Sequence, residues 1–237
     1  MNLVKEHWTQ LDIKDFKDYL MSFSKGTEKG LWEQRIINTK LPCIAVSSPD
    51  VKRIIDEISK GNFTEFLDFW IWDNFTHTTV NGGLICKIKD FDLMKIYLFK
   101  YAEKIDNWAS CDMIKFKIND KNKVMFFELS QELIMSKKPF VRRLGIRILF
   151  SFVSDDKYID KIFNSLNSFE NETEYYVNMI NAWLFAECFT KQREKTIQFL
   201  DSHKLNKFTI NKGIQKCRDS FRISKEDKEM LLKYKVK

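Results

Sequence analysis

The chain has 237 residues, of which 44% are hydrophobic and 31% charged, a composition that excludes an intrinsically disordered protein. Its seven glycines and three prolines are too few for a sandwich or barrel with many tight turns, and no apolar stretch is long enough to predict a membrane span. The net charge of +7 favours a polyanionic partner.

The predicted elements are helices along the whole chain. Apolar residues recur at helical spacing in about a dozen segments of roughly 10 to 18 residues. The first well-marked helix opens at Ser48-Pro49-Asp50, where Ser48 is expected to cap the helix and Pro49 to occupy its first helical position. Ser224 and Asp227 resemble a capping box that opens the last helix. Between them, helices are predicted over residues 63–72, 91–105, 124–135, 140–153, 158–166, 175–189 and 196–200.

The connections between these segments are short and polar, as at residues 119–122 and 167–172, and Gly82-Gly83 predicts a turn or a close helix contact. Amphipathic helices joined in this way form a bundle or a stack of helix pairs, and their order does not decide between the two. The helix pairs that begin near Phe140 and Tyr175 are about 35 residues apart, which favours a HEAT-like stack. We predict an all-α fold in one domain, residues 1–237.

Positive charge is concentrated in two segments. The first, residues 191–237, holds 14 Lys and Arg against 6 Asp and Glu, an excess larger than the net charge of the whole chain. The second, in the middle of the chain, has no acidic residue and comprises Lys137, Lys138, Arg142, Arg143 and Arg147. Such clusters are typical of phosphate binding. The alternative, which composition alone supports equally well, is a basic face that is exposed to solvent and binds nothing.

Trp108 and Asp112 are four residues apart, so a helix presents both on one face. An aromatic ring beside a carboxylate suits a cationic ligand. The alternative that the spacing alone favours is a core tryptophan, with Asp112 exposed or paired with a lysine. Trp183 lies in a segment so apolar that we expect it to be buried in the core.

The patterns of common cofactor and nucleophile sites are absent from the sequence. His7, His77 and His203 are far apart and form no metal-binding pair, and no glycine-rich phosphate loop occurs. The five cysteines are odd in number and lack a CxxC pair, so we predict neither a disulfide framework nor a zinc site. We expect no cofactor and no metal, and a reducing cytoplasm as the compartment.

Five landmarks occur in an order and spacing that resemble one family. They are VSSPDVKRI at 46–54, NWASCD at 107–112, FVRR at 140–143, the segment 175–183 that ends in Ala182-Trp183, and NKGIQK at 211–216. Together they resemble the bacterial DNA alkylation repair enzymes of the AlkD-like type, from about Leu31 to the end of the chain. The resemblance implies a superhelix of HEAT-like antiparallel helix pairs whose basic concave surface holds duplex DNA.

The resemblance also implies an activity, namely excision of N3- and N7-alkylated purines by hydrolysis of the N-glycosidic bond, without flipping the base into a pocket. By position, Asp112 is similar to the catalytic carboxylate, Trp108 and Trp183 to the aromatic pair that flanks the lesion, and Arg143 to an arginine that contacts the DNA backbone. The full set of residues expected to bind DNA is Lys137, Lys138, Arg142, Arg143, Arg147, Lys212, Lys216 and Arg218.

The expected partner is double-stranded DNA that contains alkylated purines, bound by a monomer in a bacterial cytoplasm, at the nucleoid. The alternative is a non-catalytic HEAT-like module that binds nucleic acid or a protein. Two departures from the family bear on specificity. His77-Thr78-Thr79-Val80 stands where relatives have a glutamate, and Phe185-Ala186-Glu187 lacks the arginine of the usual Leu-Arg-Glu.

Overall fold

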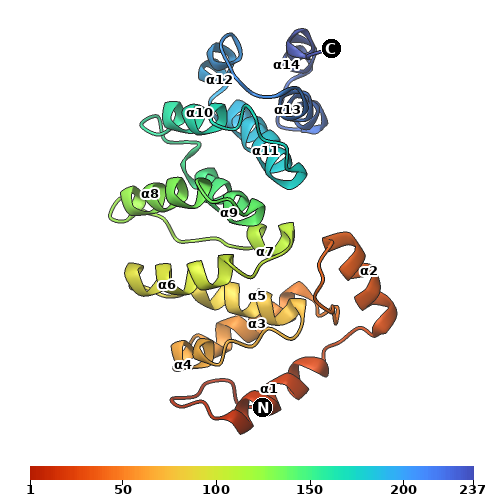
Figure 1. Cartoon of the computed structure of the whole chain (residues 1–237), viewed down its shortest axis with the longest axis vertical. Helices are drawn as coiled ribbons and strands as arrows, with labels where there is room; N and C mark the ends of the chain where they lie inside the picture. The colour runs from red at the N-terminus through yellow and green to blue at the C-terminus, as the bar shows by residue number, and fades with distance from the viewer. The chain divides into compact units, whose positions relative to one another are not determined.

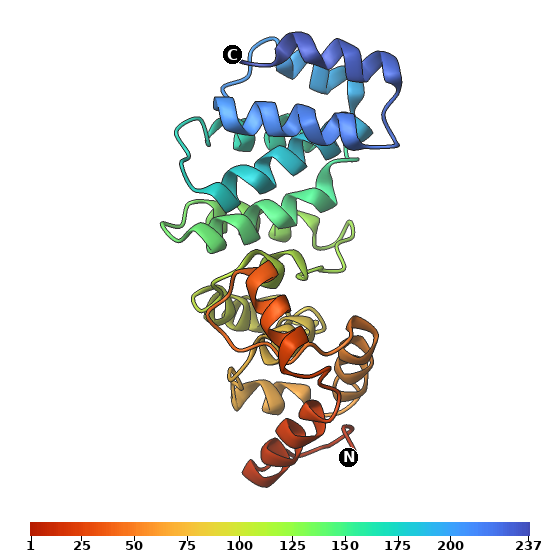
Figure 2. The same cartoon turned by 90° about the vertical axis from the view of Figure 1, so that its right-hand side faces the viewer.

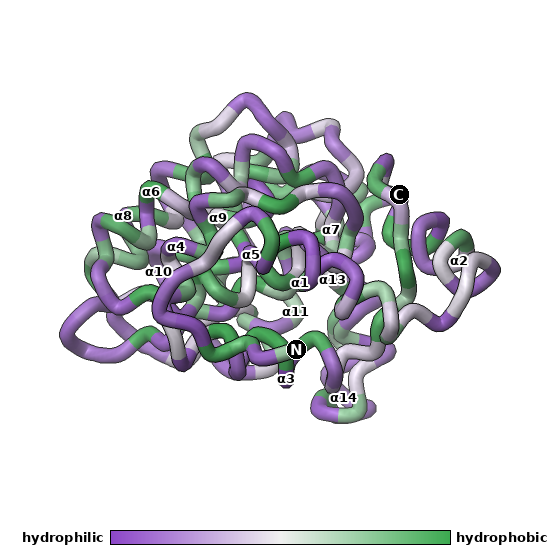
Figure 3. Tube along the Cα trace, turned by 90° about the horizontal axis from the view of Figure 1, so that it is seen from below, coloured by the Kyte–Doolittle hydropathy of each residue, from purple (hydrophilic) through white to green (hydrophobic).

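The computed structural model describes residues 1–237 and contains fourteen α-helices, two short 3-10 helices and no strand, which confirms the all-α prediction. The chain forms two compact units, Met1–Lys117 (unit 1) and Ile118–Lys237 (unit 2). The prediction of one continuous domain stays a prediction. Hydrophobic and hydrophilic positions are interspersed along the chain (Figure 3).

Unit 1 is built from seven helices, which Figure 1 labels in chain order. They are α1 (Gln10–Met21), α2 (Thr27–Ile37), α3 (Ser48–Ile58), α4 (Phe63–Asp68), α5 (Phe75–Ile85), α6 (Phe91–Ala102) and α7 (Trp108–Asp112). Helix α5 is the centre of the unit, since it packs against α3, α4, α6 and α7.

Side-chain caps set the starts of several helices in unit 1. Helix α3 is capped by Ser47, whose hydroxyl accepts the Asp50 N–H at 3.3 Å, so the predicted cap at Ser48 is one residue too late. Asn74 caps α5 and Asn107 caps α7 through their side-chain oxygens. Each cap satisfies an N–H that the first turn of a helix leaves without a backbone partner.

One helix prediction in unit 1 is wrong, and for Gly82-Gly83 the second of the two predicted alternatives, a close helix contact, is confirmed. The helix predicted over 63–72 ends at Asp68, and Trp70 takes a left-handed backbone conformation with φ of 49°, which a continuing helix cannot contain. Gly82-Gly83 lies inside α5 and makes close helix contacts. A Cβ at Gly83 would lie 2.4 Å from Cδ1 of Ile55 on α3, so this glycine lets the two helices approach.

Unit 2 contains α8 (Lys123–Ile134), α9 (Pro139–Leu149), α10 (Ile159–Asn167), α11 (Tyr175–Lys191), α12 (Arg193–Leu200), α13 (Lys207–Asp219) and α14 (Lys225–Met230), with 3-10 turns at Phe150–Phe152 and Leu231–Tyr234. Helix α9 packs on α8 and α11, and α11 packs on α13. Figure 2 shows α9, α11 and α13 in succession on one side of this unit.

No helix of the structure combines the length and the apolar character that crossing a bilayer requires.

Candidate functional site

The short helix α7 carries Trp108 and Asp112, and its start and position are fixed by polar contacts. The Asn107 side chain accepts the Ser110 N–H at 2.8 Å. The hydroxyl of the buried Tyr101 donates to the Ser110 carbonyl at 3.0 Å, which ties α7 to α6. A five-residue helix gains little stability from its own hydrogen bonds, so these tertiary contacts hold it in place.

Trp108 and Asp112 are both half-buried. The Trp108 indole N–H donates to the Ile36 carbonyl at the end of α2, with 3.4 Å between the atoms. Trp108 is therefore neither a core side chain nor a fully exposed one, and one edge of its ring is held by α2.

Asp112 lines a pocket of about 690 Å³ within unit 1. Its walls come from α2, α3, α5 and α7 together with the segments that flank α3, α5 and α7. Three carboxylates and three lysines line it: Glu33, Asp56, Asp112, Lys52, Lys87 and Lys115. Asp56 is held between Lys52 and Lys87, each ammonium 2.8 Å from one of its oxygens, and these two lysines lower its pKa. Apolar side chains such as Val51, Ile55 and Phe75 make up much of the remaining lining, so the pocket suits a ligand with both charged and apolar parts.

Glu33 is one of the three carboxylates of this pocket, and no sequence pattern singles it out. It is half-buried, its Oε2 accepts the Ala45 N–H at 3.0 Å, and burial raises its pKa. Ala45 has a φ of 52°, a conformation that a non-glycine residue adopts at a cost, so the contact with Glu33 helps to hold this turn. Glu33 on α2 and Asp112 on α7 are far apart in the sequence, so only the tertiary fold brings their carboxylates to one pocket.

The segment at which the sequence departs from the family forms the start of α5. His77 is 3% exposed, its Nδ1 accepts the Asp73 N–H at 3.3 Å, and burial lowers its pKa to about 4. His77 is therefore a neutral core residue at pH 7. Thr79 lines the pocket with Asp112, and its hydroxyl donates to the Phe75 carbonyl at 3.1 Å.

Trp183 lies in unit 2, on α11, and it is 37% exposed, so the expectation that it is a core side chain is wrong. Its ring lies 4.6 Å from that of Phe150, and the Arg147 guanidinium is 5.3 Å from the Phe150 ring and 6.0 Å from the Trp183 ring. The apolar run around Trp183 buries the other faces of α11, whereas Trp183 itself reaches the surface beside an arginine.

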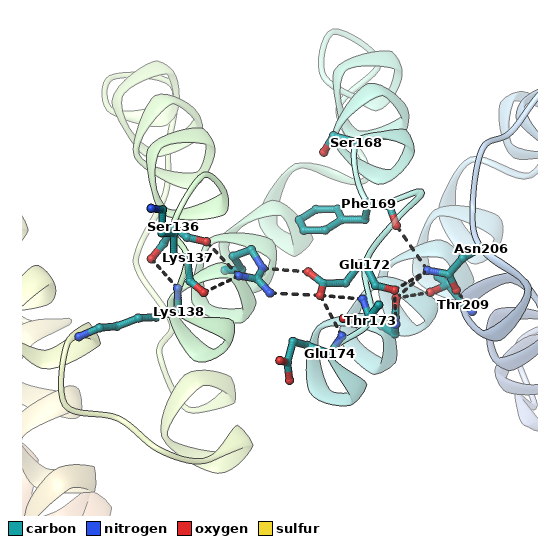
Figure 4. Close-up of polar contacts among 12 residues, drawn as sticks. Ser136, Lys137, Lys138, Ser168, Phe169, Glu172, Thr173, Glu174, Asn206 and Thr209 are labelled. Carbon is teal, nitrogen blue, oxygen red and sulfur yellow. Dashed lines mark hydrogen bonds and ion pairs between the residues drawn. The ribbon is translucent and has the colours of Figure 1, made fainter.

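Arg142 forms an ion pair that joins α9 to the segment before α11. Its Nε and Nη2 donate to the two carboxylate oxygens of Glu172 at 2.8 and 3.1 Å, and its Nη1 donates to the carbonyls of Ser136 and Lys137. Figure 4 shows Glu172 at the centre of these contacts, with its carboxylate also accepting the N–H groups of Thr173 and Glu174. All three guanidinium nitrogens are thus engaged within the protein, which supports a structural role for Arg142.

Arg143 is only 5% exposed, and its Nη1 donates to the Tyr176 carbonyl at 2.6 Å. The other residues expected to bind DNA in unit 2 are more accessible. Lys137, Lys138 and Lys212 are exposed, and Arg147, Lys216 and Arg218 are half-buried. The structure thus divides the predicted basic set into two inward arginines and six side chains that solvent reaches.

The predicted site residues fall into both units. Unit 1 brings Trp108 and Asp112 together on α7, and unit 2 holds Trp183 and every basic residue of the predicted set. No cluster of three or more His, Cys, Asp and Glu side chains is arranged to hold a metal ion. Burial raises the pKa of the Cys43 and Cys217 thiols to about 12, so both stay protonated at neutral pH.

A model of the DNA alkylation repair enzyme family matches residues 26–217, from the residue before α2 to near the end of α13. No curated protein and no solved structure matches the chain.

Proposed function

The chain belongs to the DNA alkylation repair enzyme family, and from this premise we propose that it is a DNA glycosylase. Its substrates are N3- and N7-alkylated purines in duplex DNA, and it hydrolyses the N-glycosidic bond without drawing the base into a pocket. The observation that carries the proposal is the half-buried carboxylate of Asp112, which lines the pocket in unit 1 and shares α7 with Trp108.

An alkylated purine with a positive charge is already a good leaving group, so the enzyme has to stabilise the cationic sugar that forms as the bond breaks. A carboxylate at about 4 Å from that charge contributes on the order of 1 to 4 kcal/mol at surface-like dielectric constants. In the proposed mechanism Asp112 stabilises this charge and orients the attacking water. Solvent reaches the pocket, and a half-buried carboxylate interacts with a cation more strongly than an exposed one.

Trp108 and Trp183 are the proposed aromatic contacts of the lesion nucleotide. The half-burial of Trp108 and the 37% exposure of Trp183 are compatible with this role, because both leave ring surface for a ligand. An indole face attracts a cation through its quadrupole and contacts a sugar through its apolar surface, so it selects charged lesions without reading base edges. The accessible lysines and arginines of unit 2 are the proposed contacts of the DNA backbone, which bind it independently of sequence.

The test is release of free base from methylated duplex DNA. Purified protein is incubated with the duplex, and 3-methyladenine and 7-methylguanine are measured for the wild type, Asp112→Asn and Glu33→Gln. Glu33→Gln is the matched control, since it removes a carboxylate of the same pocket while a glutamine oxygen can still accept the Ala45 N–H. We expect Asp112→Asn to slow release roughly 10- to 1000-fold, as loss of about 1.4 to 4 kcal/mol implies, and Glu33→Gln to have a much smaller effect.

Duplex binding by all three proteins is measured in parallel. If the wild type binds duplex DNA and releases no base, the chain is a non-catalytic DNA-binding module and the glycosylase proposal fails. If Asp112→Asn releases base at the wild-type rate, Asp112 is not the catalytic carboxylate.

A further inference from the structure

The last residues of the chain are held against unit 2 at three points. Leu231 is fully buried. The Tyr234 hydroxyl donates to a carboxylate oxygen of Asp201 at 3.2 Å. The Asn211 side chain on α13 forms two hydrogen bonds with the backbone of Val236, donating to its carbonyl at 2.8 Å and accepting its N–H at 3.0 Å. Lys235 lies between the second and third anchors, so its backbone position is fixed.

A pocket of about 590 Å³ opens beside this segment. Its lining consists of three lysines, two carboxamide side chains and one aromatic ring: Lys207, Lys212, Lys235, Asn211, Gln215 and Phe208. No carboxylate lines it, and Gln215 donates to Asp219 one helical turn further along α13. Three ammonium groups around one hollow without a carboxylate attract an anion.

We propose that this pocket binds a backbone phosphate of duplex DNA and that Asn211 is the positioning residue that brings Lys235 into it. Lys207 and Lys212 come from α13, whereas Lys235 comes from a segment beyond residues 26–217, the part that matches the family. The proposal rests on the DNA binding of the proposed function and adds to it a phosphate contact that depends on the fold of the last residues.

The aromatic neighbours of the pocket favour a nucleic-acid phosphate over a free one. Phe208 is 36% exposed and Tyr175 is 54% exposed, and their rings lie 5.8 Å apart. Free inorganic phosphate has no apolar part for these rings to contact, whereas a nucleotide places a deoxyribose next to each phosphate. An anion pocket edged with exposed aromatic rings therefore suits a sugar–phosphate chain.

The experiment measures how duplex affinity depends on salt. Each phosphate that a lysine neutralises contributes about 0.9 to the slope of log K against log salt concentration. We expect Lys235→Ala to reduce the magnitude of the slope by about 0.9 and to weaken binding roughly five- to tenfold near 0.1 M salt. Asn211→Ala should produce most of the same change although it removes no charge, because it releases the segment that carries Lys235. The double variant should match Lys235→Ala alone, since the two changes remove one contact.

Lys233→Ala is the control, because Lys233 lies in the same segment and carries the same charge but does not line the pocket. It should keep the wild-type slope. Thermal unfolding of Asn211→Ala checks that the variant is folded. Lys212→Ala tests the pocket from a lysine on α13, and it should reduce the magnitude of the salt slope by the same amount as Lys235→Ala.

Three results would overturn the proposal. A wild-type slope for Lys235→Ala would mean that Lys235 contacts no phosphate, and a wild-type slope for Asn211→Ala alone would remove its positioning role. Titration with inorganic phosphate separates the two sources: binding of phosphate that Lys235→Ala abolishes, with an unchanged DNA slope, would assign the pocket to the free anion. These outcomes do not depend on base release. The phosphate-pocket proposal can therefore be wrong while the glycosylase proposal holds, and the glycosylase proposal can be wrong while the phosphate-pocket proposal holds.

Discussion

Units 1 and 2 are both built from α-helices alone, yet they distribute charge differently. Unit 1 holds 17 basic and 17 acidic residues, whereas unit 2 holds 23 basic and 16 acidic ones, so the whole excess of +7 belongs to unit 2. Unit 1 contains the pocket with Asp112 and Glu33, and unit 2 contains the lysine pocket beside α13. One helical architecture thus carries a pocket with both carboxylates and lysines in unit 1 and a pocket with lysines but no carboxylate in unit 2.

Each unit buries some polar groups with a partner and others without one. In unit 1, His77 is buried as a neutral side chain, and the Asn81 amide donates to the Ile71 carbonyl at 2.7 Å. In unit 2, Arg142 and Glu172 are withdrawn from solvent as an ion pair, while the Asn181 amide is fully buried without a hydrogen-bond partner. In both units, local pairing decides what each buried polar group costs.

The largest expected effect comes from breaking the ion pair of unit 2. Arg142→Met should lower the free energy of unfolding by about 3 to 5 kcal/mol, because it leaves the Glu172 carboxylate, 8% exposed, without its cation. Urea denaturation measures the change. The double variant Arg142→Met/Glu172→Met should lose less than the single one, since no unpaired charge remains.

The control for this pair is Arg193→Met, which breaks the contact between Arg193 and Asp227, where the arginine side chain is 46% exposed. A surface ion pair contributes about 0 to 1 kcal/mol. Equal losses from Arg142→Met and Arg193→Met would contradict the view that burial makes the Arg142 pair important.

The next effect concerns pH and His77 in unit 1. Burial lowers the pKa of His77 from 6.5 to about 4, with Lys17 acting in the same direction and Asp73 opposing it. Between these pH values the unfolded chain binds the proton and the folded protein does not, so stability falls as pH falls from 6.5 toward 4. The shift corresponds to roughly 3 kcal/mol over that range.

His77→Gln should remove this contribution, so that the difference between wild type and variant in the free energy of unfolding changes between pH 7 and pH 4.5. His203 in unit 2 also has a pKa lowered by burial, and His203→Gln should change the pH dependence in the same direction. A difference between wild type and His77→Gln that is constant with pH would contradict this, because it would show that the pKa of His77 is the same in the folded and the unfolded protein.

The smallest expected effects come from two buried asparagines, one in each unit. Asn81→Leu should destabilise the protein by about 1 to 3 kcal/mol, because it leaves the buried Ile71 carbonyl without its donor. Asn181→Leu should raise the free energy of unfolding by up to about 1 kcal/mol, because it removes a buried amide that has no partner. Thermal or urea unfolding measures the stability of both variants. If Asn181→Leu destabilises the protein as much as Asn81→Leu does, the Asn181 amide is hydrogen-bonded to water.

Sequence reasoning predicted the fold class and most helices, because their apolar residues recur at helical spacing. It did not delimit α1, α2, α5 and α13. Most residues of α5 are buried, so this helix has no polar face for the pattern to reveal. It extended one helix to Trp72, since aromatic residues continue the apolar pattern while Trp70 turns the backbone away. Periodicity reports burial, and it does not report a change in backbone direction.

The candidate site was predictable in part. Trp108 and Asp112 are linked by a spacing of four residues, which the sequence shows directly. Glu33 could not be found in this way, because it reaches the pocket from α2, far from α7 in the chain. The exposure of Trp183 was equally hidden, since an apolar run does not tell which of its members lies at the surface.

The sequence alone determined that the chain is helical, that its positive charge lies in the second half, and that a tryptophan and a carboxylate share one helical face. These properties depend on composition and on spacings of a few residues. Tertiary structure decided which arginines face inward, which tryptophan reaches solvent, and that Lys235 joins two lysines of α13. Such facts depend on contacts between residues far apart in the chain, whose pairing no local pattern encodes.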